Sequence, residues 1–326
     1  MTRLRGTLLT FTSRVQTVLS LIAALGLMLG SIAGATAQDE KPTVTVGSKE
    51  FTEQLIVGEM LALLLEDAGY EAERQLGLAG TAVVHEALVN GEVDTYVEYT
   101  GTGLLAILNM SLPTGTPTAS TDATPAAGAD AVYDIVKKGY AEQFNVAWLD
   151  PLGFNNTYTL ALTEERAAEL GVESISDLIA VSGDLTFGGT QEFLTRPDGL
   201  PGLMEAYEGL EFAETQGFDP GLVYQAVDSG DVDVISGFAT DGRIPALGLV
   251  TLEDDQSFFP PYFAAPVVRQ ELLDEDPAVA DVLNSLAGLL DDQTMAGLNA
   301  QVDVDGEEPE DVARAFLEEQ GLIGAE

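Results

Sequence analysis

The amino-acid sequence predicts an α/β fold made of two similar lobes. Two observations predict it: strand-like segments alternate with helix-like segments, and a stretch from the first half of the chain recurs in the second half. Strands alternating with helices are typical of α/β domains with mostly parallel sheets. A repeat whose parts recur in the same order indicates two lobes built on one plan.

The first elements follow the N-terminal leader. Residues 43–48, TVTVGS, alternate in hydropathy and are rich in β-branched residues, which predicts a strand. Residues 50–70, EFTEQLIVGEMLALLLEDAGY, carry apolar residues at helical spacing and reach a glycine at position 69, which predicts a helix. The next stretch, TAVVHEALVNGEVDTYVEYTGTG, predicts a short helix, a turn at Gly91 and a strand.

The internal repeat aligns residues 85–103 with residues 224–242 without gaps. The identical pairs are Ala87/Ala226, Gly91/Gly230, Val93/Val232, Asp94/Asp233 and Gly103/Gly242, and the aromatic pair is Tyr99/Phe238. A second match, residues 43–52 with residues 184–194, again runs strand, glycine turn and Glu-Phe. Ligands of open α/β sheets bind at the carboxyl ends of the strands, so we expect the aromatic pair to face each other across a cleft between the lobes.

The N-terminus predicts an export signal. Three arginines and no acidic residue precede an apolar run over residues 18–32, and the triplet Ala35-Thr36-Ala37 follows it. This order is typical of a secretory signal peptide, so we assign residues 1–37 to the leader, with cleavage after Ala37. The alternative is an uncleaved leader that anchors the chain. We therefore expect an exported protein, periplasmic or held at the cell surface.

Composition excludes several classes of protein. The chain carries 54 acidic and 13 basic residues, for a net charge of −41. Such a surface repels nucleic acid and anionic lipid, so neither is an expected partner. The absence of cysteine excludes a disulfide scaffold, a cysteine nucleophile and a thiolate metal site. We predict no cofactor and no metal site.

Enzyme active sites are hard to build from this sequence. The segment TGTG at residues 100–103 lacks the Lys and Ser/Thr of a phosphate-binding loop. His85 is the only histidine, and no G-x-S-x-G surrounds a serine, so we predict a structural role for His85. Paired carboxylates of the glycosidase type stay open as an alternative, because acidic residues occur throughout the chain.

Aromatic residues stand beside several predicted strand ends and turns. They are Tyr99, Tyr158, Phe238 and Tyr262. Each alone is consistent with ordinary core packing. Two cations, Lys49 and Arg196, occupy corresponding loops of the two lobes, and the combination suggests a cage of ring faces with an anion clamp. Such cages recognise quaternary ammonium groups, because the ring quadrupole attracts a cation.

Six segments resemble the substrate-binding proteins of glycine betaine/choline (osmoprotectant) ABC transporters. The segments are VGSKEFTEQLIVGEML, VEYTGTG, LDPLGFNNTYTLAL, EFLTRPDGLPGL, ATDGRI and FFPPYFAAPVV. The resemblance implies the two-lobed periplasmic-binding-protein fold, type II, with the ligand in the cleft between the lobes. It also implies that the lobes close over a trimethylammonium group inside an aromatic box.

The resemblance implies a role for each candidate residue. Tyr99, Tyr158 and Tyr262 match tyrosines of the aromatic box. Phe238 stands where the family usually has Tyr, which keeps a ring face and loses a hydroxyl, so the range of ligands is in doubt there. The positions that hold the carboxylate of a betaine are matched by Lys49, Thr102 and Arg196. The alternatives are a solvated loop cation for Lys49, a turn residue for Thr102 and a structural ion pair for Arg196.

We interpret the chain as an extracytoplasmic solute-binding protein of an ABC importer and not as an enzyme. Lobe one is assigned to residues 41–154, with residues 111–131 as a flexible Thr-, Ala- and Pro-rich loop, lobe two to 155–263, and a return to lobe one to 264–326. Glycine betaine or proline betaine is the favoured ligand, and choline and carnitine are further candidates. The alternatives are an amino acid or polyamine in the same fold and a secreted carboxylate-dependent hydrolase. The implied partner is a membrane permease, and we expect a monomer.

Overall fold

The computed structural model describes residues 41–112 and 127–324. Pro42–Glu326 form one compact unit. The predicted leader, residues 1–37, lies outside the described residues.

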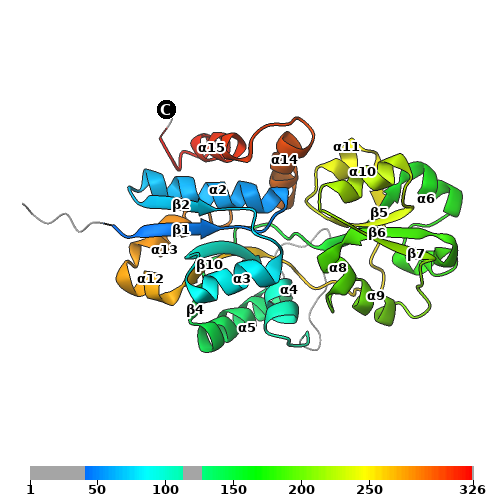
Figure 1. The fold of residues 1–326 in the computed structure, drawn as a ribbon, viewed down its shortest axis with the longest axis horizontal. Coiled ribbons are helices and arrows are strands. Elements are labelled where there is room, and N and C mark those ends of the chain that lie inside the picture. Colours follow the sequence, from blue (N-terminus) through cyan, green and yellow to red (C-terminus); the bar gives the residue numbers. More distant parts are fainter. Residues whose placement is uncertain (1–40, 113–126, 325–326) are drawn as a thin grey trace, which may run out of the picture. The chain divides into compact units, whose positions relative to one another are not determined.

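Two five-stranded sheets of the same design build the compact unit (Figure 1). In the first, the spatial order is β2 (Glu71–Gln75), β1 (Thr43–Gly47), β3 (Thr95–Tyr99), β10 (Ala264–Arg269) and β4 (Val146–Trp148). In the second, it is β7 (Glu214–Phe218), β6 (Thr186–Thr190), β8 (Val234–Phe238), β5 (Tyr158–Thr163) and β9 (Leu249–Thr251). We call the parts built on these sheets lobe one and lobe two. The two-lobed α/β fold is confirmed.

The prediction of mostly parallel sheets holds for four of the five strands in each sheet, and β10 and β5 are the exceptions. In lobe one, β1 pairs in parallel with β2 and β3, whereas β10 runs antiparallel to β3 and β4. Lobe two repeats this pattern, with β5 antiparallel to β8 and β9. The physical reason is the route of the chain. Strands β5 and β10 each enter a sheet after the chain has crossed from the other lobe, so no right-handed helical crossover sets their direction.

Helices cover both faces of each sheet (Figure 1). Lobe one carries α2 (Thr52–Asp67), α3 (Thr81–Asn90), α4 (Thr100–Thr102), the π-helix η1 (Gly103–Ile107), α5 (Ala127–Phe144), α12 (Gln270–Glu275), α13 (Ala278–Asn284), α14 (Asp292–Asp303) and α15 (Pro309–Glu319). Lobe two carries α6 (Glu164–Leu170), α7 (Ile175–Leu178), the 3₁₀-helix η2 (Ser182–Asp184), α8 (Gln191–Thr195), α9 (Leu200–Ala206), α10 (Leu222–Ser229) and α11 (Arg243–Ala246).

The central strand β3 shows how the core is divided. All five of its side chains are buried, and successive side chains point to opposite faces of the sheet. Tyr96 packs into the cluster formed with α3 and α5, whereas Val97 packs into the cluster formed with α2. His85 of α3 makes edge-to-face contacts with Tyr140 and Phe144 of α5. Burial lowers the pKa of His85, so its ring is neutral and part of the core, as predicted.

The internal repeat seen in the sequence is the same structure in both lobes. Gly91 and Gly230 end equivalent helices with φ angles of 75° and 76°, which glycine adopts without strain. Asp94 and Asp233 each accept a 2.8 Å hydrogen bond from a backbone N–H, of β1 and β6 respectively, and each is paired with an arginine. The repeat therefore places the matched aromatic residues at the ends of the equivalent strands β3 and β8.

The predicted loop over residues 111–131 ends too late. Helix α5 begins at Ala127, so residues 127–131 are helical. Alanine has the highest helix propensity, and the Ala-rich end of this segment continues into an amphipathic pattern. Residues 113–126 lie outside the described residues.

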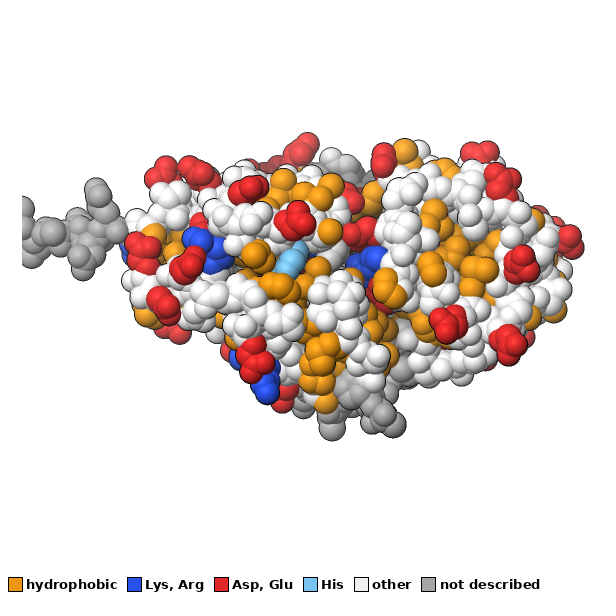
Figure 2. Space-filling view, turned by 60° about the horizontal axis from the view of Figure 1, so that its bottom comes forward, with side chains coloured by type: hydrophobic (Ala, Val, Ile, Leu, Met, Phe, Trp, Pro, Cys, Tyr) orange, Lys and Arg blue, Asp and Glu red, His pale blue; other side chains and the backbone are white. Residues whose placement is uncertain are grey.

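The surface of the described chain reflects its composition. On the face shown in Figure 2, Asp and Glu side chains are scattered widely, and Lys and Arg side chains are few. Across residues 41–112 and 127–324, no helix combines the length and the hydropathy that crossing a bilayer requires.

Candidate functional site

A cavity of about 320 Å³ lies at the carboxyl ends of strands from both sheets. Lobe one contributes residues that follow β1 and β3, and lobe two contributes the start of β5, helix α8 and the end of β8. All seven residues singled out from the sequence line this cavity: Lys49, Tyr99, Thr102, Tyr158, Arg196, Phe238 and Tyr262. The structure therefore brings the candidate residues of both lobes together in one place.

Five aromatic rings form one wall of the cavity. The ring of Tyr158 stacks on Phe238, with centroids 5.2 Å apart, and meets Tyr262 edge-on at 5.6 Å. Phe51 stacks on Phe238 at 5.2 Å and on Tyr99 at 6.2 Å. The expectation that Tyr99 and Phe238 face each other directly is thus incomplete, because Phe51 lies between them.

Phe51 is the aromatic residue that sequence reasoning missed. The sequence contains a signal for it, because the Glu-Phe match of the second repeat pairs Phe51 with Phe193. In lobe two, Phe193 is fully buried and packs edge-on against Tyr158 at 5.0 Å. In lobe one, Phe51 is half-buried at the N-terminus of α2 and lines the cavity. Equivalent positions in the repeat therefore supply one core ring and one cavity ring.

Two of the three tyrosine hydroxyls on this wall are hydrogen-bonded to buried carboxylates. The Tyr99 hydroxyl donates to Glu53 at 2.7 Å, and the Tyr262 hydroxyl donates to Asp198 at 2.8 Å. Burial raises the pKa of Tyr99, Tyr158 and Tyr262 above its usual value, so the three rings stay neutral and their hydroxyls keep their protons. The wall is therefore rigid, aromatic and uncharged.

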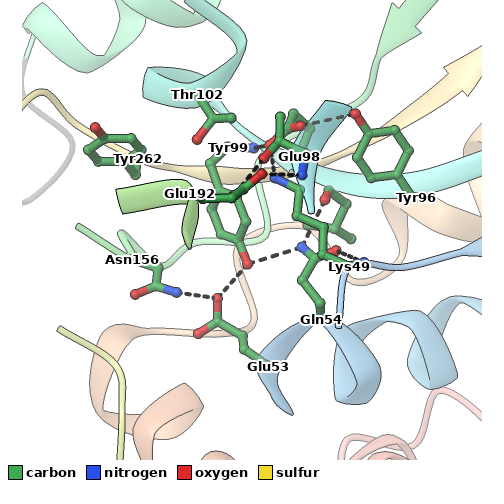
Figure 3. Close-up of polar contacts among 12 residues, drawn as sticks. Lys49, Glu53, Gln54, Tyr96, Glu98, Tyr99, Thr102, Asn156, Glu192 and Tyr262 are labelled. Atoms are coloured by element: carbon green, nitrogen blue, oxygen red, sulfur yellow. Dashed lines mark hydrogen bonds and ion pairs between the residues drawn. The ribbon is translucent and has the colours of Figure 1, made fainter. Parts of the chain in front are cut away.

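Lys49 is buried and paired. Its Nζ lies 2.6 Å from Oε1 of Glu98 and 5.1 Å from the centre of the Tyr99 ring. Glu98 also accepts from the Tyr96 hydroxyl at 3.0 Å and from the backbone N–H of Tyr99 at 2.8 Å (Figure 3). The alternative that Lys49 is a solvated loop cation was wrong, because its side chain is only 3 % exposed.

Arg196 bridges the two lobes. Its guanidinium pairs with Asp198 through Nε at 2.8 Å and through Nη2. Nη2 also donates to Thr102 Oγ1 at 3.1 Å and Nη1 to Thr81 Oγ1 at 3.2 Å, and both threonines belong to lobe one. Nη1 lies 3.5 Å from Glu192. Arg196 therefore has the structural ion pair of the alternative interpretation, and it also lines the cavity.

Glu192 makes a second contact between the lobes. Its Oε1 accepts a 2.5 Å hydrogen bond from the backbone N–H of Thr81, in the first turn of α3. A carboxylate is favoured there by the partial positive charge of a helix N-terminus. Glu50 and Asp219 also line the cavity, and burial raises the pKa of Glu50, with the negative charges of Glu192 and Asp219 acting in the same direction. The cavity mouth thus carries carboxylates that favour a cation.

The glycines after Tyr99 serve close packing and not a sharp turn. Strand β3 ends at Tyr99 and the chain continues directly as α4 and η1, with none of the described positive φ angles in this segment. A Cβ on Gly101 would lie 2.7 Å from ring carbons of Tyr262 and 2.9 Å from the carbonyl oxygen of Pro261. Only glycine allows Tyr262 to lie against this helix.

We therefore expect Gly101→Ala to lower the free energy of unfolding by about 1–3 kcal/mol, the usual cost of overpacking. Denaturant unfolding monitored by circular dichroism measures this loss in the free energy of unfolding. Gly183→Ala is the matched control, because a Cβ there meets no atom within 4 Å. Equal losses in the two variants would show that the space at Gly101 is not needed.

The family model for the substrate-binding domain of ABC-type glycine betaine transport systems matches residues 42–319. The chain belongs to this family. Its members bind small ligands outside the cytoplasm and deliver them to a membrane permease, and they are binding proteins, not enzymes.

Relatives and solved structures agree with this assignment. The chain is 36% identical over 305 residues to a glycine-betaine-binding protein of Pseudomonas aeruginosa, covering 90% of this chain and 92% of the other. It is 35% identical over 309 residues to a carnitine transport binding protein of Listeria monocytogenes, covering 94% and 96%. A crystal structure of a glycine betaine/carnitine/choline ABC transporter protein matches with a TM-score of 0.67 and 31% identity, covering 86% of this chain and 99% of that one.

A further relative has a longer chain. The ergothioneine transport permease/ergothioneine binding protein of Helicobacter pylori is 38% identical over 287 residues, which are 88% of this chain. This chain spans 49% of that protein's length.

Within the described part of this chain, no group of three or more His, Cys, Asp or Glu side chains is arranged to hold a metal ion.

Proposed function

We propose that the cavity binds a small trimethylammonium compound, with glycine betaine or proline betaine favoured and choline and carnitine as further candidates. The observation that carries the proposal is the aromatic wall of five rings beside two buried cations in one cavity. A volume of about 320 Å³ lies at the small end of ligand pockets, which suits a compact osmolyte.

The aromatic wall supports recognition of the ammonium group. A quaternary ammonium cannot donate hydrogen bonds, so ring faces are its natural partners, and each desolvated face contributes on the order of 0.5–2 kcal/mol. Tyr99, Tyr158, Phe238 and Tyr262 are the proposed box, to which the structure adds Phe51. Phe238 keeps its face toward Phe51 and Tyr158 without a hydroxyl.

The carboxylate end of a betaine is assigned to Lys49, Thr102 and Arg196. Both cations already have a buried carboxylate partner, Glu98 and Asp198 respectively. A ligand carboxylate would therefore add charge-assisted hydrogen bonds to existing pairs and would not meet a free cation. This is the reason why choline, which lacks the carboxylate, stays a candidate.

The proposed mechanism is closure of two lobes over the ligand. We assign residues 41–154 and 264–326 to one moving body and residues 155–263 to the other, in a monomer that is exported with the help of its leader. The contacts of Arg196 and Glu192 with Thr81 and Thr102 support this mechanism, because they join the lobes directly across the cavity. Such hinged closure excludes water and shapes the surface that the permease meets.

Calorimetric titration of the purified protein tests the proposal. The panel is glycine betaine, proline betaine, carnitine, choline and ergothioneine, with glycine and putrescine representing the amino-acid and polyamine alternatives. At least one trimethylammonium compound should bind ten times more tightly than glycine, because a protonated amine is strongly hydrated and a quaternary one is not. Preferential binding of glycine or putrescine, or no binding by any trimethylammonium compound, would contradict the proposal.

A further inference from the structure

A buried carboxylate lies directly behind the aromatic wall. Glu53, in the first turn of α2, is 2 % exposed. Phe51, Asn156, Pro220 and Phe238 line both the ligand cavity and a smaller cavity of about 10 Å³, and Glu53 lines the smaller one. These four residues therefore lie between Glu53 and the ligand cavity.

Four side chains from four different segments hold the Glu53 carboxylate (Figure 3 shows two of them). Oε1 accepts from the Tyr99 hydroxyl and from Asn156 Nδ2, both at 2.7 Å. Oε2 accepts from Thr240 Oγ1 at 2.5 Å and from Asn299 Nδ2 at 3.3 Å.

The hydrogen-bond donors around Glu53 favour its ionised form. Gln54 Nε2 donates to the Val97 carbonyl oxygen at 2.8 Å and to the Tyr99 hydroxyl oxygen at 3.0 Å, which leaves the Tyr99 proton for Glu53. Asn299 Nδ2 is oriented as a donor by the Thr240 carbonyl oxygen at 2.9 Å. Burial raises the pKa of Glu53 above its usual 4.5, and the four donors act against that rise. Hydrogen bonds donated to both oxygens favour the charged form of the carboxylate.

No cation among the described residues forms an ion pair with this carboxylate. Of the ion pairs within residues 41–112 and 127–324, none includes Glu53. Lys49 is paired with Glu98, Arg196 with Asp198. Arg243, which lines the same small cavity, is paired with Asp241 and Asp303. An isolated buried carboxylate is costly, because it has lost its water and gained no opposite charge.

We propose that Glu53 is the fixed counter-charge of the ligand's ammonium group. This inference rests on the proposed function. Glu53 is a positioning residue: it acts through the hydroxyl of Tyr99 and through the dry wall of Phe51 and Asn156, without touching the ligand. Coulomb attraction is strong across such a low-dielectric layer. Glu53 therefore selects a positively charged ligand over an uncharged one of the same shape, a distinction that ring faces and shape alone make less well.

Glu53 could instead act as a tie between the lobes, and that role predicts a different binding result. Thr240 belongs to lobe two, so Glu53 also ties the lobes together, and losing that tie would weaken every ligand alike. Only the counter-charge role changes the ratio between an ammonium ligand and the isostere in which carbon replaces the ammonium nitrogen. The experiment therefore compares ligand pairs.

The ligand pairs are glycine betaine with 3,3-dimethylbutanoate, and choline with 3,3-dimethylbutan-1-ol. In each pair a quaternary carbon replaces the quaternary nitrogen. Wild type, Glu53→Gln and Thr240→Val are titrated with all four compounds. We expect Glu53→Gln to reduce the wild-type preference for the ammonium member of each pair at least tenfold, equivalent to about 1.4 kcal/mol. Thr240→Val removes one donor and leaves the charge, so it should keep that preference.

An unchanged preference in Glu53→Gln overturns the inference alone and makes Glu53 a tie between lobes. A wild-type protein that binds neither glycine betaine nor choline overturns the proposed function and this inference with it. If the Glu53→Gln variant fails to fold, a second measurement on the wild-type protein tests the inference. The carboxyl carbon of Glu53 in the wild-type protein should have the NMR chemical shift of an ionised group at pH 7, and the shift of a protonated group would overturn the inference.

Discussion

Replacing Arg196 with alanine should lower the free energy of unfolding by about 3–5 kcal/mol, the usual cost of breaking a buried ion pair by removing one partner. The Asp198 side chain is fully buried, and without the guanidinium its remaining hydrogen bond is from Tyr262. Denaturant unfolding of the ligand-free protein measures the loss. Arg166→Ala is a matched control, because it removes the same charge from a half-exposed pair in lobe two and should cost no more than about 1 kcal/mol.

A double variant separates the carboxylate clamp from the structural ion pair. Arg196→Ala/Asp198→Ala removes both charges, so stability should recover in part while the clamp stays absent. Glycine betaine should then bind about thirtyfold or more weakly, which is on the order of 2 kcal/mol, and choline should be affected little. Calorimetric titration of the double variant with both ligands shows whether Arg196 binds the ligand carboxylate. Equal losses for the two ligands would show that Arg196 is structural only.

Replacing Tyr158 with alanine should have the largest effect on binding of any single ring. Tyr158 is the centre of the wall, in contact with Phe238, Tyr262, Phe193 and Phe259. Its loss removes one cation–π face and loosens two others, so we expect a ten- to hundredfold weaker affinity for betaine and choline alike. It should also cost about 3–5 kcal/mol of stability, as large aromatic truncations do.

Tyr158→Phe is the control for that prediction. It keeps the ring and removes only the hydroxyl, so its affinity for both ligands should stay within a few-fold of wild type. Titrations below the unfolding transition of each variant keep the comparison to folded protein. A folded Tyr158→Ala protein with unchanged affinity would remove Tyr158 from the proposed box.

Much of the fold could be predicted because it depends on local patterns. The glycines at 91 and 230 end helices whichever tertiary neighbours they have, since only their backbone conformation matters. The aspartates at 94 and 233 bind backbone groups of the neighbouring strands in both lobes, so the repeat preserved them together. Such features recur in the sequence because each lobe needs them for itself.

The direction of β10 and the start of α5 could not be predicted with the same success. Strand direction depends on where the chain enters a sheet, and β10 enters after the whole of lobe two. The direction of β10 therefore depends on long-range packing. Composition alone does not mark where a Thr- and Pro-rich segment gives way to an Ala-rich helix at Ala127.

The candidate site, like the fold, was predicted from the sequence only in part. By itself the sequence determined that Tyr99 and Phe238 end equivalent strands, because their spacing repeats in the two lobes. Only the tertiary structure decided which carboxylates the candidate side chains contact. Among 54 acidic residues, nothing local distinguishes Glu53, Glu98 and Asp198 from the rest. They become distinct only when folding buries them beside Tyr99, Lys49 and Arg196, where the loss of water makes each charge depend on its partners.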